Sequence, residues 1–154
     1  MSDNRLSWDE WFLGLAKYVS TRSKDPSTKT GAVIVRPDRS VASMGYNGFA
    51  KGMDDNPELY ANREEKYSRI IHCEMNALNF AKESVNGYTL YTYPFISCDR
   101  CMPHMIQAGI IRFVAPKPTD DQLSRWAFSF EKTRKYAQES KVELVEVDIE
   151  SIIS

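Results

Sequence analysis

Apolar residues recur along the chain at two spacings, one typical of amphipathic helices and the other typical of buried strands. Near the start, Ser7 and Glu10 form a capping box, which predicts that a helix begins here. The apolar stripe of this helix consists of Trp8, Trp11, Phe12, Leu15, Ala16 and Val19. The polar stretch from Thr21 to Thr30 ends the predicted helix.

Two short apolar runs follow, separated by residues with turn chemistry. The runs are Gly31 to Arg36 and Val41 to Tyr46, and Pro37 to Ser40 lie between them, which predicts a β-hairpin. From residue 72 onward helical and strand patterns alternate, and Gly109 is placed as a helix C-cap. We predict helices over 72–82, 98–108 and 120–138, and strands over 88–93, 110–115 and 142–147.

This order of elements predicts the fold class. Strands that alternate with helices form largely parallel sheets with helices on both faces. We therefore expect an α/β fold, a three-layer α/β/α sandwich with a five-stranded, mostly parallel mixed sheet and an antiparallel first hairpin. The length predicts a single domain over residues 1–154. The polar segment 47–67 is expected to be a functional loop or an insertion.

Composition narrows the class of protein. Hydrophobic residues make up 42% of the chain and charged residues 27%, which is ordinary for a globular protein. The net charge of -1 argues against a nucleic-acid partner, because such partners select for a basic surplus. No apolar run has the length of a membrane span and no signal peptide is recognisable, so we expect a cytoplasmic protein with no membrane partner. The three cysteines do not suggest a disulfide framework.

Candidate chemistry is concentrated at the starts of two predicted helices. His72 begins one of these helices, and Cys98 and Cys101 lie three residues apart at the start of the other. At this spacing the two cysteines share a helix face. The helix dipole at an N-terminus lowers the pKa of a thiol. One imidazole and two thiolates provide three ligands, whereas zinc prefers four. Three protein ligands are typical of a catalytic zinc site, because a water molecule can take the fourth position and become acidic there.

Glu74 lies two residues after the candidate ligand His72 and is the candidate proton shuttle. By itself it would be read as a carboxylate that stabilises a helix N-terminus. His104 is an alternative ligand because it shares a helix face with the cysteines, although a solvent or interface position is favoured for it. Cys98 and Cys101 could also belong to a structural zinc knuckle, which requires two further ligands.

The H-x-E and C-x-x-C motifs resemble the signature of the zinc-dependent cytidine deaminase superfamily. The resemblance covers most of the chain from Leu6 to about Ala115, fades over 50–67 and in the last third, and is specific to the deoxycytidylate deaminases. The segments that resemble this family are Leu6–Glu10, Arg22–Pro26, Gly31–Val35, Gly45–Gly48, His72–Ala77 and Ile106–Ile110. Two positions differ from the usual family pattern. Ser97 replaces the proline before the first cysteine, at the end of a stretch one residue longer than usual, and Cys73 replaces an alanine.

The resemblance implies zinc-dependent deamination of dCMP to dUMP and a role for each matching residue. It implies that His72, Cys98 and Cys101 bind zinc and that Glu74 shuttles protons. The backbone N–H of Cys73 is then expected to face the base carbonyl, and Asn47 to bind a sugar hydroxyl. Ser23 and Lys24 are expected to contact the 5′-phosphate. It also implies a hexamer activated by dCTP and inhibited by dTTP, with Mg²⁺ on the effector, which would bind near Gly48, Lys51 and Gly52.

Other functions compatible with the motif remain as alternatives. The substrate could be another cytosine nucleotide, a nucleoside, or adenosine in tRNA, although the near-zero net charge argues against tRNA. A hypothesis from another class is a non-catalytic, nucleotide-sensing zinc protein. The intact Glu74 argues against this hypothesis.

Overall fold

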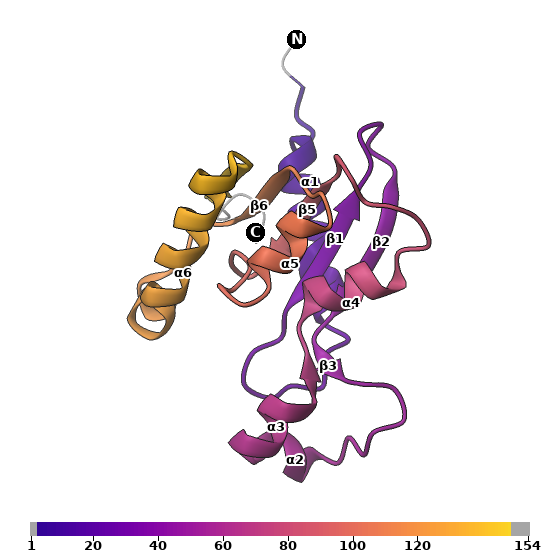
Figure 1. The fold of residues 1–154 in the computed structure, drawn as a ribbon, viewed down its shortest axis with the longest axis vertical. Helices are drawn as coiled ribbons and strands as arrows, with labels where there is room; N and C mark the ends of the chain where they lie inside the picture. The colour runs from indigo at the N-terminus through magenta and orange to yellow at the C-terminus, as the bar shows by residue number, and fades with distance from the viewer. Residues whose placement is uncertain (1–2, 149–154) are drawn as a thin grey trace.

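A mixed β-sheet forms the centre of the fold, and helices cover both of its faces (Figure 1). The computed structural model describes residues 3–148. The five strands of the sheet lie in the order β2-β1-β5-β6-β7. Their bounds are Gly31–Val35 (β1), Val41–Tyr46 (β2), Thr89–Tyr93 (β5), Arg112–Pro116 (β6) and Glu143–Val147 (β7).

Strand directions in this sheet include the predicted antiparallel hairpin and a second antiparallel pair that was not predicted. β1 is antiparallel to both of its neighbours, β2 and β5, whereas β5, β6 and β7 pair in parallel. Among the described strands of this sheet, β1 alone therefore runs against the other four. The predicted mixed sheet with an antiparallel first hairpin is confirmed.

Alternate residues of β1 face two separate cores, because successive side chains of a strand point to opposite faces. Val33 and Val35 pack with residues of α1 (Trp8–Ser20) on one face. Ala32 and Ile34 pack on the other face with residues of α4 (Cys73–Phe80), α5 (Met102–Gln107) and α6 (Asp120–Ser140). These are the three layers that the alternation of helices and strands predicts.

The first helix begins at the predicted capping box. The Ser7 hydroxyl accepts a hydrogen bond from the Glu10 N–H, and the Glu10 carboxylate accepts one from the Ser7 N–H, both at 3.1 Å. The helix lies very close to the start of β1, where a Cβ atom on Gly31 would be 2.1 Å from the Ala16 carbonyl oxygen. Glycine is therefore required at this contact.

The segment 47–67, expected to be a functional loop or an insertion, contains regular structure and is therefore not an irregular loop. Its elements, extending to residue 71, are β3 (Gly48–Phe49), α2 (Pro57–Ala61), α3 (Arg63–Arg69) and β4 (Ile70–Ile71). Asn56 and Asn62 cap the two helices, and β3 pairs with β4 in a small antiparallel sheet. Figure 1 shows these elements together below the main sheet, directly before α4 in the chain.

The start of α5 differs from the prediction. The helix predicted over 98–108 begins at Met102, because residues 98–101 form a turn and Pro103 favours the first turn of a helix. Gly109 has a φ of 99°, as the predicted C-cap requires. No helix within residues 3–148 has the length and apolar character needed to cross a membrane.

Candidate active site

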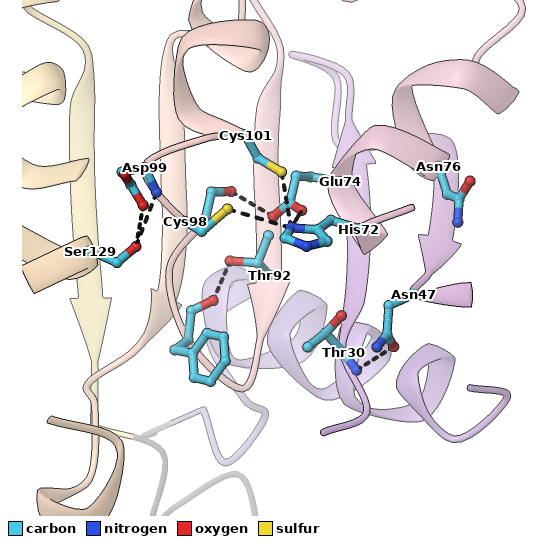
Figure 2. A network of polar contacts seen from close by, with 12 residues as sticks. Thr30, Asn47, His72, Glu74, Asn76, Thr92, Cys98, Asp99, Cys101 and Ser129 are labelled. Carbon is cyan, nitrogen blue, oxygen red and sulfur yellow. Dashed lines mark hydrogen bonds and ion pairs between the residues drawn. The ribbon is translucent and has the colours of Figure 1, made fainter. Parts of the chain in front are cut away.

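The candidate site lies where the start of α4 approaches the turn between β5 and α5 (Figure 2). α4 can lie directly on β2 because residue 45 is glycine: a Cβ atom there would be 2.5 Å from the Ala77 nitrogen. The amide of Asn76 adds a hydrogen bond of 2.7 Å to the Tyr46 carbonyl at the end of β2. These contacts fix the first turn of α4, which presents His72 and Glu74.

The two cysteines lie in a tight turn rather than on a helix, which corrects the predicted local structure. The Cys98 carbonyl accepts hydrogen bonds from the N–H groups of Cys101 at 3.1 Å and Met102 at 3.0 Å. The chain therefore folds back before α5 begins. Both thiols still approach the same atom, Nδ1 of His72, from one side of the turn (Figure 2).

The three candidate ligands have distances that suit a zinc ion. Nδ1 of His72 is 3.4 Å from the Cys98 sulfur and 3.2 Å from the Cys101 sulfur, and the ligand atoms of all three residues lie within 4.8 Å of one another. Tetrahedral zinc with ordinary bond lengths separates a sulfur and a nitrogen ligand by about 3.5 Å. His104 is exposed on α5 and does not belong to this group, although it was a candidate alternative.

Hydrogen bonds within this group shift the pKa values of all three of its members. The hydrogen bond from the Cys101 thiol lowers the pKa of Cys98, and the same bond raises the pKa of Cys101, which keeps the proton. The hydrogen bond with Cys98 raises the pKa of His72 to about 8. A divalent cation would take the place of these protons, because zinc binds two thiolates and a neutral imidazole.

Glu74 is buried beside the ligand group in the first turn of α4. Its Oε1 lies 3.9 Å from Nδ1 of His72, and its Oε2 accepts a hydrogen bond of 2.9 Å from the Ser97 hydroxyl. Burial raises the pKa of this carboxyl group above the ordinary value of a glutamate. A carboxyl group with a raised pKa can both accept and donate a proton near neutral pH.

Cys73 is buried in the core formed by α4, α5 and the sheet. Its backbone N–H lies in the first turn of α4, where N–H groups have no partner within the helix. This N–H is therefore available to an acceptor outside the helix, as the resemblance to deaminases implies.

Asn47 and Ser23 are joined to each other in a buried network. The Asn47 amide nitrogen donates to the Thr28 carbonyl at 2.9 Å and to Asp25 at 3.3 Å, and its oxygen accepts from the Thr30 N–H at 2.9 Å. The Ser23 hydroxyl donates to the Asn47 carbonyl at 2.9 Å. The Asn47 side-chain oxygen keeps one lone pair for a ligand, whereas Ser23 would have to give up its bond to Asn47 to reach a phosphate.

Several of the remaining predicted residues line one hollow of about 290 Å³. Its predicted members are Lys24, Asn47, Gly48, Lys51 and Gly52. Arg22 also lines it, although the sequence analysis did not identify this residue. Lys24 pairs with Asp55 at the surface. Asp55 lines the hollow as well, so the lining contains three cationic side chains and one carboxylate, an excess of positive charge that suits an anionic ligand.

The structure also reveals supporting residues that no local sequence signal indicates. The Thr133 hydroxyl of α6 donates to the Ser97 carbonyl at 2.7 Å, and the Asp99 N–H donates to the Ser129 hydroxyl at 3.1 Å. Both contacts join α6 to the turn that contains the cysteines. They depend on how α6 packs against that turn, which a single sequence does not show.

Comparison with known proteins identifies relatives of the chain. Residues 6–116 match the family model described as the cytidine and deoxycytidylate deaminase zinc-binding region. An uncharacterized deaminase in the luxG 3′ region of Aliivibrio fischeri is 36% identical over 137 residues, which cover 89% of this chain and 91% of the relative. The deoxycytidylate deaminase of Mus musculus is 34% identical over 128 residues, which cover 78% of this chain and 71% of the relative.

Solved structures share the fold. The dCMP deaminase of the cyanophage S-TIM5, in complex with dCMP and dUMP, matches with a TM-score of 0.67 at 20% identity, covering 94% of this chain and 100% of that chain. A diaminohydroxyphosphoribosylaminopyrimidine deaminase/reductase from Thermotoga maritima matches with a TM-score of 0.65 at 19% identity, covering 94% of this chain and 37% of that chain. Together with the family match and the two relatives, these findings show that the chain belongs to the cytidine and deoxycytidylate deaminase family.

Proposed function

We propose that the protein is a zinc-dependent enzyme that deaminates dCMP hydrolytically to dUMP and ammonia, and so supplies dUMP for thymidylate synthesis. The observation on which this proposal rests is the buried Glu74 carboxyl group beside the group formed by His72, Cys98 and Cys101. The named deoxycytidylate deaminases among the relatives support dCMP as the substrate.

In the proposed reaction, His72, Cys98 and Cys101 would hold the zinc ion, which when bound supplies Lewis acidity and lowers the pKa of water. Glu74 accepts a proton from the attacking water and delivers it to the amino group of the base. The base carbon gains a bond to oxygen and loses its bond to nitrogen, and the amino group leaves as ammonia. The backbone N–H of Cys73 donates to the base carbonyl and orients the ring.

The nucleotide would extend from this centre towards the cationic hollow. We assign the sugar hydroxyl to the Asn47 side-chain oxygen and the 5′-phosphate to Lys24, with the neighbouring Arg22 as a further cation. The proposed role of Ser23 at the phosphate requires its hydroxyl to exchange the Asn47 carbonyl for the ligand. This exchange would couple phosphate binding to the position of Asn47.

We further propose regulation of a hexamer by dCTP as activator and dTTP as inhibitor, with Mg²⁺ on the effector phosphates. Gly48, Lys51 and Gly52 would contact the effector. Lys51 lines the same hollow as Lys24, so we expect binding at the two positions to influence each other. Saturation curves for dCMP with and without each triphosphate, and the mass of the protein in solution, test these proposals.

The first experiment measures the loss of the cytosine absorbance in the presence of zinc-loaded protein, with dCMP, CMP, deoxycytidine and dCTP compared as substrates. We expect selective turnover of dCMP and none by the Glu74→Ala variant. Equal turnover by the wild type and the variant would contradict the role of Glu74. No turnover of any of the four compounds would favour a polynucleotide substrate or a nucleotide-sensing protein.

A further inference from the structure

Ser97 lies directly before Cys98, the first cysteine of the C-x-x-C motif, at a position where the deaminase signature has proline. A proline side chain has no hydrogen-bond donor, whereas a serine has a hydroxyl group. Here the hydroxyl donates to Oε2 of Glu74 at 2.9 Å, and both residues are 4% exposed. Water therefore has little access to this bond, and a hydrogen bond is stronger in such a buried site than in water.

The two oxygens of Glu74 consequently have different surroundings (Figure 2). Oε2 is bonded to Ser97, and Oε1 faces the ligand group, 3.9 Å from Nδ1 of His72. The terminal torsion of a glutamate has a broad energy minimum, so a carboxyl group without an anchor rotates readily. The bond to Ser97 restricts this rotation and keeps the other oxygen directed at the group formed by His72, Cys98 and Cys101.

Ser97 is itself held in place from the opposite side. Its backbone carbonyl accepts the hydrogen bond from Thr133, whose side chain is completely buried in α6. A continuous chain of two hydrogen bonds thus runs from α6 through Ser97 to Glu74. Within this chain, the backbone of Ser97 fixes its position and the hydroxyl fixes the carboxyl group.

We propose that Ser97 is a positioning residue for proton transfer by Glu74, and that Thr133 supports it from α6. Ser97 anchors one carboxyl oxygen so that the other can accept and return the proton in the same geometry. The proposal rests on the proposed function of Glu74. It concerns a residue at which this chain differs from the usual family pattern.

The test compares Ser97→Ala, which removes the hydroxyl, with Ser97→Thr, which keeps it. A misplaced catalytic group costs up to about 100-fold in rate. We therefore expect Ser97→Ala to lower kcat by about 10-fold to 100-fold with KM within about twofold and unchanged zinc content. Ser97→Thr should restore most of kcat. The matched control is Ser43→Ala, which removes another buried hydroxyl, one that donates to the Ala77 carbonyl at 2.6 Å. This control should retain kcat.

A second measurement needs no turnover. The free energy of unfolding of the zinc-loaded protein is measured for Ser97→Ala in the wild type and in a Glu74→Ala background. We expect Ser97→Ala to be more destabilising when Glu74 is present, since the two side chains interact. If the wild type deaminates dCMP, two results would overturn the proposal. One is additive effects of the two substitutions on the free energy of unfolding, and the other is an unchanged kcat in Ser97→Ala. A wild type that deaminates none of the four compounds would remove the proposed function and this proposal together.

Discussion

At the scale of single residues, the chemistry of the site depends on the short distances between two thiols, an imidazole and a carboxyl group. Cys98 and Cys101 both approach Nδ1 of His72, and Glu74 lies beside them in a buried position. Each of the three ligands is expected to be necessary, because three protein ligands are the minimum typical of a catalytic zinc site.

Replacing Cys98 with alanine should therefore abolish both zinc binding and deamination. We expect about one zinc ion per chain in the wild type and close to none in Cys98→Ala, measured by metal analysis after dialysis. His104→Ala is the matched control, and it should keep its zinc. Stoichiometric zinc in Cys98→Ala would show that another residue, with His104 as the first candidate, completes the site.

The raised pKa of Glu74 predicts a pH-dependent stability of the metal-free protein. Because burial raises the folded-state pKa above the unfolded value of about 4.3, the native state favours the protonated carboxyl group. This contribution is fully present below pH 4.3 or so and is lost as the pH rises through the folded-state pKa. Glu74→Gln, which stays neutral, should therefore stabilise the metal-free protein at pH 7.5, on the order of 1 kcal/mol.

Urea unfolding of both metal-free proteins at pH 5 and pH 7.5 provides the measurement. The advantage of Glu74→Gln should shrink at the lower pH, where the wild-type carboxyl group is more protonated. An advantage that grows as the pH falls would contradict the raised pKa.

The candidate ligands and Glu74 could be proposed from sequence because their residue types and spacing suffice for the chemistry, and the structure brings these residues together. The contact between Ser97 and Thr133 could not, since 36 positions separate them and no periodicity relates them. The local structure of the cysteines was also wrong in the prediction. Cys101 has helical dihedral angles, φ −82° and ψ −32°, but it caps α5 instead of lying within it.

At the scale of elements, the strongly periodic segments were predicted well and the polar ones were not. α1 has a capping box and an apolar stripe, so its pattern alone determined its type. α2 and α3 have five and seven residues and hardly any buried side chain, so they have no apolar stripe to detect. Their remaining signals are the caps Asn56 and Asn62.

α3 is fixed to the rest of the fold by an ion pair between Lys66 and Asp25 at 2.8 Å. Asp25 is 2% exposed and also accepts a hydrogen bond from Asn47. Lys66→Met should destabilise the protein by about 2–4 kcal/mol, because it leaves a buried carboxylate without its cation. It should also raise KM for dCMP, since Asp25, which accepts a hydrogen bond from Asn47, is then no longer held by Lys66.

The surface pair of Lys24 and Asp55 offers a matched comparison for stability. An exposed pair contributes little, so Asp55→Asn should leave the unfolding transition almost unchanged. Urea unfolding of Lys66→Met and Asp55→Asn decides the point. Equal effects of the two substitutions would show that burial of Asp25 is unimportant.

At the scale of the whole molecule, the candidate ligands join parts of the chain that are distant in sequence. His72 belongs to the start of α4, and the cysteines follow β5, where Cys98 lies 26 positions after His72. A metal ion bound to all three would therefore tie two elements on the same face of the sheet. Binding to the native state alone stabilises the entire fold.

Removal of the metal with a chelator should accordingly lower the Tm of the wild type, and added zinc should restore it. At free zinc concentrations of 100 to 1,000 times Kd, the stabilisation is about 3–4 kcal/mol. Thermal unfolding with and without chelator measures the shift. Cys98→Ala should show no such shift, and an equal shift in this variant would place the metal elsewhere.

The contacts of α6 with the cysteine turn can form only late in the synthesis of the protein. The match to the family ends at residue 116, before α6, yet Ser129 and Thr133 hold the turn that precedes α5. On the ribosome, every residue of the zinc and shuttle motif is synthesised before its support. A nascent chain that has just completed β6 therefore contains the whole motif without these two contacts, and we expect the turn to gain its support only when α6 has emerged and docked.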